Sequence, residues 1–254
     1  MNDHASKLKG LLWVTIACCI GMAFVIGISP LVRRIPWAWE KRLASVLQTD
    51  TPKQQCPYDP QVNVLFQQVV KRIYPIHQDD TSFSIHVQII KDPTVNAYAE
   101  LGGKILVNSG LLQQAESPEE VAGILAHEIG HVYYRHILEA TITHMLTAGG
   151  INLIFGDSSS TSNWANYFLN ISFSRSQEAQ ADKAGLLRLK NAYVSNLGLT
   201  HFFERMEKSG TASHFLSDHP SNQSRMEMIQ KFDNQKVTPI MSPEAWAHIK
   251  NYCT

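Results

Sequence analysis

Several features that would place a chain in other functional classes are missing from this 254-residue sequence. Lysine and arginine together number 22, as do aspartate and glutamate, so no excess charge of one sign indicates a nucleic-acid partner. The sequence has no internal repeat, no long low-complexity tract, and neither a phosphate-binding loop nor a dinucleotide-binding glycine motif. Its length suffices for one domain with a sizeable core, and the chemistry must be sought in other motifs.

Cysteine is also scarce, and two of the four cysteines lie in an apolar run near the N-terminus. Residues 11–32 carry no charge over 22 positions, which is about 33 Å as a helix and enough to cross a bilayer. Because the run is long and no small-x-small site follows it, we predict an uncleaved anchor and not a signal peptide. Residues 1–10 are then a short tail. Residues 33–56, with two tryptophans beside basic side chains, are predicted to be a linker at the membrane interface.

The residues alone leave the side of the membrane open. Two basic residues precede the span and four follow it closely, which by the positive-inside rule favours a cytoplasmic domain. The remaining cysteines, Cys56 and Cys253, lie near the two ends of the rest of the chain and would close a disulfide in an oxidising compartment. Two unpaired thiols are an equally simple interpretation.

The first motif with chemical content is His-Glu-Ile-Gly-His at residues 127–131, in an apolar stretch predicted to be a helix. His127 and His131 lie on one helical face, about 6 Å apart at their Cβ atoms, and this spacing suits two imidazole ligands of one zinc ion. Glu128 lies beside the metal without being needed as a ligand, so it can act as the general base that takes a proton from water. The alternative is a pair of partly buried histidines on an amphipathic helix.

The surroundings of the motif support a helix. Ser117 is predicted to be its N-cap and Glu120 the third residue of a capping box. Gly130 lowers helix propensity by roughly 1 kcal/mol relative to alanine, which indicates that another element packs closely there. His136 and His144 follow the motif but lie off its metal-facing side, and we interpret them as ordinary surface or core histidines.

A third ligand is available further along the chain. Glu178 and Asp182 share one face of a second predicted helix, beside alanines that permit close helix packing. Glu178 would complete a site of two histidines and one glutamate and leave the fourth position for water, as in catalytic zinc sites. Asp182 would accept the other ring N–H of a ligand histidine and so fix its tautomer. Taken alone, the pair is more simply an exposed acidic face.

In combination, the motifs resemble those of the HtpX/BepA-type zinc metallopeptidases of peptidase family M48, whose relatives include the Oma-type and type I CAAX prenyl protease peptidases. The resemblance covers roughly residues 57–232 and rests on four motifs in the family's order: 96–99, 102–107, 127–131 and 174–182. It implies that His127, His131 and Glu178 bind one Zn²⁺ per subunit, that Glu128 is catalytic, and that Asp182 supports the ligands. It also favours the periplasmic face of an inner membrane, with the cytoplasmic face as the alternative.

The resemblance further implies that a His-Pro pair at residues 219–220, with Arg225, closes over the active site. Two catalytic roles are open for His219. It either donates a hydrogen bond to the oxyanion of the tetrahedral intermediate or occupies the open metal position as a fourth, inhibitory ligand. A loop histidine without a role is the third interpretation. Arg225 is predicted to anchor an acidic group in the site and to be one of the substrate-binding residues, although a lone arginine is more often structural.

Two predicted strands suggest how a peptide would bind. Residues 82–90 alternate in polarity before becoming apolar, and residues 104–107 give the second strand. An edge strand beside the zinc helix can accept an extended chain by β-augmentation. We predict that Asn96, Ala97 and Tyr98 bind substrate in this way.

We therefore predict a mainly helical α+β, zincin-like domain over residues 57–254 with a small antiparallel sheet, tethered by one N-terminal transmembrane helix. The helix of the zinc motif is expected to extend past it, through residue 155. A polar loop at residues 156–163 would then act as a lid. Residues 59–74 and 197–208 are predicted to be amphipathic packing helices.

The predicted activity is zinc-dependent endoproteolysis of misfolded or unassembled envelope proteins. Its partners would be unfolded or extended polypeptides and the membrane, with no nucleic acid. The alternative is a chaperone-like binding protein for outer-membrane protein assembly, with gated or slow proteolysis. A prenyl-protein peptidase is disfavoured because that chemistry needs a chamber of several membrane spans, whereas this chain has one convincing span.

Overall fold

A computed structural model of the chain describes residues 30–47, 56–75, 84–155, 167–168, 170–208, 219, 223–232 and 236–253. The predicted tail, residues 11–29 of the predicted anchor and the loop predicted to be a lid lie outside this part of the chain. Within the described ranges, no helix combines the length and the apolar character needed to cross a membrane.

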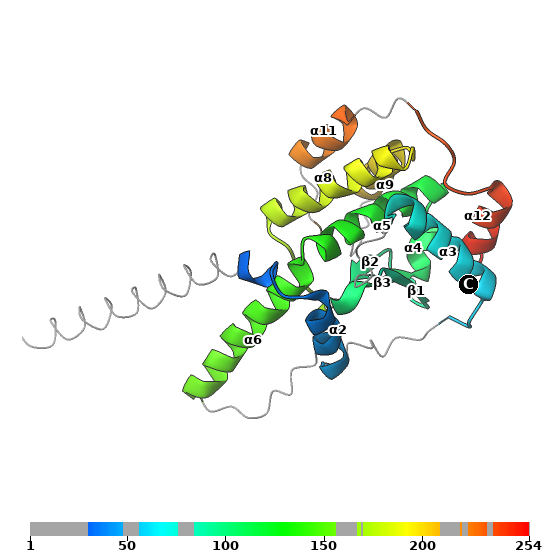
Figure 1. The fold of residues 1–254 in the computed structure, drawn as a ribbon. Coiled ribbons are helices and arrows are strands. Elements are labelled where there is room, and N and C mark those ends of the chain that lie inside the picture. The colour runs from blue at the N-terminus through cyan, green and yellow to red at the C-terminus, as the bar shows by residue number, and fades with distance from the viewer. Residues whose placement is uncertain are drawn as a thin grey trace, which may run out of the picture.

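A buried helix, α5 (Pro118–Tyr133), forms the centre of the fold and carries the histidine motif (Figure 1). Ser117 Oγ accepts a hydrogen bond from the Glu120 backbone N–H at 3.3 Å, which confirms the predicted N-cap. The Glu120 carboxylate accepts from the N–H of Glu116 and pairs with Arg205 at 2.6 Å. The predicted capping box is therefore only half formed, because a long-range ion pair draws the glutamate away from the cap.

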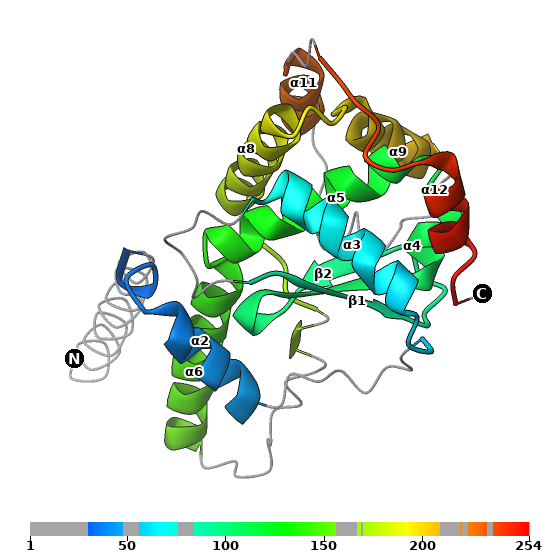
Figure 2. The same ribbon diagram turned by 45° about the vertical axis from the view of Figure 1, so that its right-hand side comes forward.

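Helices cover one side of α5, and a small sheet covers the other (Figures 1 and 2). On the helical side, α8 (Arg175–Asn191) and α9 (Leu197–Lys208) pack directly against α5, and α11 (Gln223–Lys231) lies across both. Helix α3 (Pro60–Ile73) packs against α5 and the sheet. The two packing helices predicted from the sequence are thus present as α3 and α9.

The sheet has three strands: β1 (His86–Ile90), β2 (Ala97–Ala99) and β3 (Lys104–Asn108), in the order β1-β3-β2. β2 and β3 are antiparallel and joined by the short 3-10 helix η1 (Leu101–Gly103), whereas β1 and β3 are parallel. The sheet is therefore mixed, and the prediction of an antiparallel sheet is wrong. After β1 the chain crosses to the opposite edge of the sheet, where it forms β2. The next strand, β3, returns between β2 and β1 and therefore runs parallel to β1.

The helix of the motif also ends earlier than predicted. After Tyr133 the chain turns through Arg135, whose φ is +64°, and a separate helix, α6 (His136–Phe155), begins. The cause lies outside both helices, because the Arg135 side chain is buried in an ion pair with Glu40, 2.7 Å from Nε to Oε2. Glu40 belongs to helix α2 (Trp37–Val46), which lies beside the α5–α6 turn.

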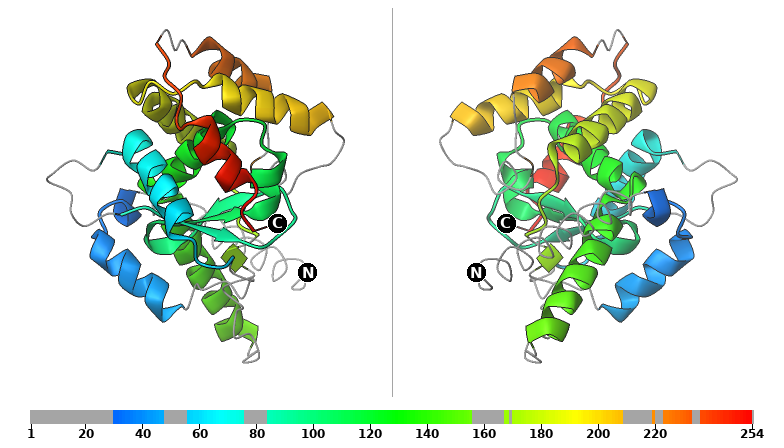
Figure 3. Two further views of the ribbon diagram at one scale, coloured as in Figure 1. Left: turned by 90° about the vertical axis from the view of Figure 1, so that its right-hand side faces the viewer. Right: turned by 90° about the vertical axis from the view of Figure 1, so that its left-hand side faces the viewer.

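The two ends of the predicted domain meet at a disulfide between Cys56 and Cys253, whose Cα atoms are 5.5 Å apart. Helix α12 (Pro243–Lys250) packs beside α3 and α4 (Ser109–Gln114) (Figure 3). Of the two interpretations that the sequence left open for these cysteines, the structure has the bonded one.

Candidate metal centre

The site forms where α5 and α8 cross at very short distance. A Cβ atom added at Gly130 would lie 2.7 Å from the carbonyl oxygen of Ala181, and one added at Gly185 would lie 3.1 Å from the backbone of Ala126. The close packing predicted at Gly130 is therefore confirmed. Helix α8 starts at a complete capping box of Ser174 and Gln177, and this start sets the direction in which the next residue, Glu178, points.

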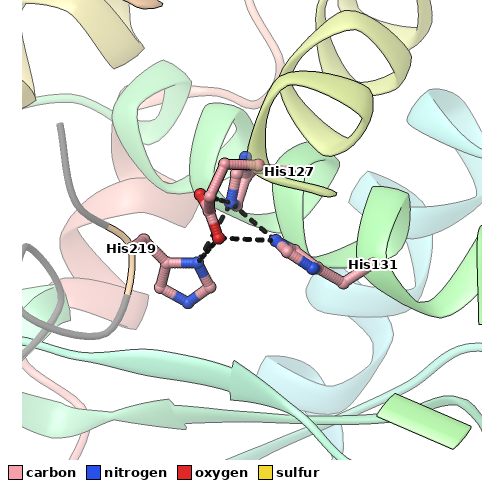
Figure 4. A group of neighbouring side chains, drawn as sticks. His127, His131 and His219 are labelled. Carbon is pink, nitrogen blue, oxygen red and sulfur yellow. Dashed lines mark hydrogen bonds and ion pairs between the residues drawn. The ribbon is translucent and has the colours of Figure 1, made fainter. Parts of the chain in front are cut away.

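Four buried side chains converge on one point: His127 and His131 from α5, Glu178 from α8, and His219 (Figure 4). His127 Nε2 lies 3.1 Å from His131 Nε2 and 3.2 Å from His219 Nδ1. Glu178 Oε1 lies 3.1 Å from His219 Nδ1 and 3.4 Å from His131 Nε2. One ligand atom from each residue therefore belongs to a group whose members are all within 4.8 Å of one another.

The size and chemistry of this group fit a transition metal. A tetrahedral zinc site with bonds of about 2.0–2.1 Å has ligand atoms about 3.3–3.4 Å from one another. The shortest separations among the four side chains here, 3.1–3.4 Å, bracket that value. Imidazole and carboxylate are ligands that Zn²⁺ and neighbouring divalent metals accept. The arrangement is thus able to hold one such ion between the two helices.

Asp182 and Arg225 form a buried ion pair behind the ligands. Asp182 Oδ1 lies 2.9 Å from His127 Nδ1, so the other ring nitrogen of His127 faces the ligand group. Arg225 donates to both Asp182 oxygens, at 2.6 and 2.8 Å, and to the carbonyl of His219 at 3.2 Å. Its Nη1 also lies 3.0 Å from Glu178 Oε2. Arg225 therefore joins the two carboxylates to the His219 backbone, while its predicted role in binding substrate stays a prediction.

Burial and ion pairing decide the charges of the site. Burial lowers the pKa of His127, but Asp182 and Glu178 outweigh this effect and raise it to about 10. Burial and the positive charge of His127 hold the pKa of His131 well below 6.5, in spite of its hydrogen bond to Glu178. Burial raises the pKa of Asp182, but hydrogen bonds from His127 and Arg225 bring it down to about 2. The three histidines likewise hold the pKa of Glu178 far below its ordinary value against burial. Both carboxylates are therefore ionised at neutral pH, as a cation site requires.

Glu128 lies at the edge of the ligand group and contacts the sheet. Its Oε2 accepts a hydrogen bond from the Ala99 N–H of β2 at 3.1 Å, and its Oε1 lies 3.4 Å from His219 Nε2. Burial raises the pKa of Glu128 above 4.5. A raised pKa is the condition under which a carboxylate becomes an effective general base near neutral pH.

Comparison with known proteins agrees with this geometry. Residues 60–233 match the sequence profile of peptidase family M48. The chain belongs to peptidase family M48. Three relatives illustrate the match within it. Mitochondrial metalloendopeptidase OMA1 of Arabidopsis thaliana is 34% identical over 58% of this chain and 31% of its own length. Metalloprotease LoiP of Escherichia coli is 32% identical over 57% of this chain and 60% of its own. The β-barrel assembly-enhancing protease of Escherichia coli is 25% identical over 63% and 36% respectively.

The matched part thus spans less than two thirds of each of these relatives. Membership of M48 places the chain in a peptidase family, and two of the relatives named here, OMA1 and LoiP, are metallopeptidases.

The residues predicted to bind peptide lie in and beside β2 of this M48 domain. Ala97 is fully buried and its N–H donates to the Asn96 side chain at 2.9 Å, while Tyr98 packs on the opposite face of the sheet. The carbonyl of Asn96 and the N–H of Glu100 bond to β3, so in an antiparallel ladder the backbone groups of Ala97 and Ala99 point to the other edge. That edge is where Glu128 binds the Ala99 N–H.

Sequence reasoning missed the contact that His136 makes. His136 is a buried histidine, as one of the two interpretations had it, but its Nδ1 lies 3.1 Å from His131 Nδ1. Burial lowers the pKa of His136 to about 4, so a neutral ring supports the ligand. The turn at Arg135 directs His136 back toward α5. The local sequence does not predict this turn, because arginine has no preference for a positive φ. His144 lies apart and stacks on Tyr167 at 4.2 Å between ring centroids.

Proposed function

We propose that this M48 chain is a membrane-anchored, zinc-dependent endopeptidase that hydrolyses peptide bonds in misfolded or unassembled envelope proteins. The observation that carries the proposal is the convergence of His127, His131 and Glu178 on one point, with the Glu128 carboxylate between that point and the edge of β2. The ligand spacing supports Zn²⁺, since separations of 3.1–3.4 Å lie close to the value of about 3.3–3.4 Å between the ligand atoms of a tetrahedral zinc site.

The reaction follows from the residues around the site. When bound, the metal supplies Lewis-acid activation of water and of the scissile carbonyl. Glu128 accepts a proton from the attacking water, whose oxygen bonds to the carbonyl carbon. Glu128 then delivers this proton to the amine nitrogen as the carbon–nitrogen bond breaks. Asp182, ionised and paired with Arg225, holds His127 so that its Nε2 faces the metal throughout.

The edge of β2 that faces away from β3 supports extended polypeptide as the substrate class. The carbonyls of Ala97 and Ala99 point to this edge and can accept hydrogen bonds from a peptide, whereas the N–H groups of the two residues already donate to the Asn96 and Glu128 side chains. Hydrogen bonds to a peptide backbone are indifferent to its side chains. A folded protein has its backbone groups already paired, so we expect unfolded or unassembled chains to be preferred. Asn96, Ala97 and Tyr98 are thereby proposed to line the peptide, and Arg225 to stay with the carboxylates it contacts.

Location in the envelope is supported by three independent observations. Residues 11–32 have the composition of a single membrane span. The disulfide between Cys56 and Cys253 is a bond that persists in oxidising compartments, which favours the periplasmic over the cytoplasmic face. One bacterial relative is named for β-barrel assembly. We therefore propose a single-pass inner-membrane protein with a periplasmic domain.

A second candidate function is chaperone-like binding of envelope proteins with gated proteolysis. The observation that favours it is His219 Nδ1, which takes part in the ligand group at 3.1 Å from Glu178 Oε1. Four protein ligands close a zinc site, whereas catalysis needs an open position. In this conformation the chain would bind a peptide on β2 without cutting it until His219 leaves.

The decisive test is Glu128→Gln in the full-length protein, with Glu119→Gln on the same helix as the matched control. We expect Glu128→Gln to retain one equivalent of zinc by metal analysis, and to lower turnover of an unfolded reporter about 10²–10⁴-fold, the usual contribution of a general base. Glu119→Gln should keep both. Unchanged turnover in Glu128→Gln would contradict the assigned reaction. Retained peptide binding with negligible turnover in the wild-type protein would favour the second function.

A further inference from the structure

Helix α2 was predicted to belong to a linker at the membrane interface, yet one of its side chains lies in the core. Glu40 is 2% exposed, whereas Trp39, its neighbour on the helix, is 66% exposed. The helix therefore has one face against the domain and one face against solvent. A glutamate is almost never buried without a partner, so its contacts indicate what the inner face does.

The first contact of Glu40 is the turn that follows the histidine motif. Glu40 Oε2 lies 2.7 Å from Nε of Arg135, and Arg135 is itself only 5% exposed. The guanidinium carbon of Arg135 lies 3.9 Å from the centroid of the Trp37 ring, so α2 encloses this cation from two sides. The positive φ of Arg135 is thus held by a residue nearly a hundred positions earlier in the chain.

The second contact of Glu40 is the turn between β2 and β3. Its Oε1 accepts a hydrogen bond from the N–H of Gly102 at 3.0 Å. Gly102 has φ +78°, and a Cβ there would lie 3.5 Å from the side chain of Ala44, so α2 packs directly on this turn. One carboxylate therefore joins two turns that are separate in sequence.

Each of these turns leads to a residue of the metal centre. Three residues before Gly102, the Ala99 N–H binds the Glu128 carboxylate at 3.1 Å. Directly after Arg135, His136 contacts the ring of His131 at 3.1 Å.

A further contact joins the same N-terminal segment to this centre. Arg33 donates to the side-chain oxygen of Gln180 at 3.2 Å, and that oxygen lies 3.4 Å from His136 Nε2. Residues 30–47 thus contact supports of both Glu128 and His131.

We propose that residues 30–47 are a brace of the metal centre and not only a tether. The Glu40 carboxylate fixes the β2–β3 turn relative to the α5–α6 turn, and thereby sets the position of Glu128 relative to His131. This positioning role rests on the proposed function for its effect on catalysis. Its effect on metal retention is independent of that function.

The test compares two Glu40 variants with a control on the same helix, all in the full-length protein in detergent. Glu40→Ala removes both contacts, Glu40→Gln keeps an acceptor for Gly102, and Arg42→Ala alters only the exposed face. For Glu40→Ala we expect kcat on an unfolded peptide reporter to fall at least tenfold with KM changed less than twofold. We also expect zinc release to a chelator to be at least tenfold faster. Glu40→Gln should lie between, and Arg42→Ala should match the wild type.

A lower Tm in Glu40→Ala, with kcat per folded molecule and zinc release both unchanged, would overturn the brace. Should Glu40→Ala fail to fold, a second experiment decides. Residues 49–54 are replaced by a site-specific protease sequence, and the native full-length protein is cut there. Retention of the N-terminal fragment on the domain, or its loss together with activity and zinc, supports the brace. Loss of the fragment with kcat and zinc release unchanged contradicts it.

These readouts separate the brace from the proposed function. A wild-type protein that binds zinc but cuts no peptide would remove the proposed function. Zinc release from Glu40→Ala would still test the brace in that case.

Discussion

At the scale of single residues, His219 has the most informative geometry. Its Nδ1 lies among the ligand atoms, and its Nε2 lies 3.4 Å from Glu128 Oε1. The sequence left two roles open, an oxyanion donor and a fourth ligand. An oxyanion donor must point at the substrate carbonyl, whereas a ligand must point at the metal. The position of Nδ1 fits the second role. Glu128 can then act as a general base only after His219 has moved out of the ligand group.

Substitution of His219 distinguishes the two roles by the sign of its effect. If His219 is an inhibitory ligand, His219→Ala should raise turnover of an unfolded reporter severalfold, because the three remaining ligands still hold zinc and leave a position open. If it is an oxyanion donor, kcat should fall about 10²–10³-fold. His201→Ala, on the exposed side of α9, is the control for losing a histidine. Steady-state kinetics with metal analysis on both variants provides the measurement.

The sequence predicted the contacts of this site unevenly, for a physical reason. His127 and His131 lie on one face wherever a helix forms, so their pairing needs only the i,i+4 rule. Glu178 and Asp182 needed the resemblance, because a carboxylate pair alone fits any solvated helix. The contacts of Glu40 and His136 were not predictable. Both depend on where Arg135 points, and tertiary packing decides that.

At the scale of elements, the crossing of α5 and α8 sets the geometry of the ligands. A Cβ at Gly130 would meet backbone atoms of Ala181 at 2.7 and 2.8 Å, and backbone cannot rotate away as a side chain can. At Gly123 the nearest atom is instead the Leu199 Cβ, at 3.0 Å. An added methyl group is therefore expected to clash more severely at Gly130 than at Gly123, so the two positions on α5 can be compared directly.

We expect Gly130→Ala to lower the free energy of unfolding by about 2 kcal/mol or more, because overpacking outweighs a helix-propensity gain of about 1 kcal/mol. Zinc affinity should fall too, since Ala181 lies between Glu178 and Asp182 on α8. Gly123→Ala should cost less and leave zinc affinity unchanged. Urea unfolding and chelator competition measure the two quantities. An equal loss of stability in both variants would mean that the α5–α8 distance is not what matters at Gly130.

Local patterns predicted the helices better than the sheet. The amphipathic repeat of α3 and α9 and the N-cap of α5 act within a few residues, so the sequence alone located them. Strand direction depends on where a connection crosses, and the short loop after β1 carries no signal for that. The parallel pairing of β1 with β3 was therefore missed although both strands were found.

At the scale of the whole molecule, the two ends of the domain are held together on one side. Besides the disulfide, His248 pairs with Asp59 at 2.9 Å, and the Tyr252 hydroxyl donates to the Pro57 carbonyl. Arg72 of α3 binds backbone carbonyls near residues 192 and 239. These contacts hold the C-terminal segment against the first helix of the M48 domain, away from the ligand group.

Reduction of the disulfide should lower stability without changing the chemistry. Cys56 and Cys253 are 197 positions apart, and a loop of this length corresponds to an entropic effect of about 5 kcal/mol in the chain-entropy model, against about 2–4 kcal/mol typically measured. At about 2–4 °C per kcal/mol for a domain of this size, reductant should lower Tm by roughly 5–15 °C. Calorimetry with and without reductant measures this shift.

A double Cys56→Ser, Cys253→Ser variant should have the lower Tm in both conditions. Turnover at 25 °C should be equal in all samples, because the bond joins the turn after α12 to the segment before α3, and neither carries a residue of the ligand group. A Tm insensitive to reductant would mean that the folded chain gains nothing from an oxidising compartment, and the periplasmic assignment would lose its structural support.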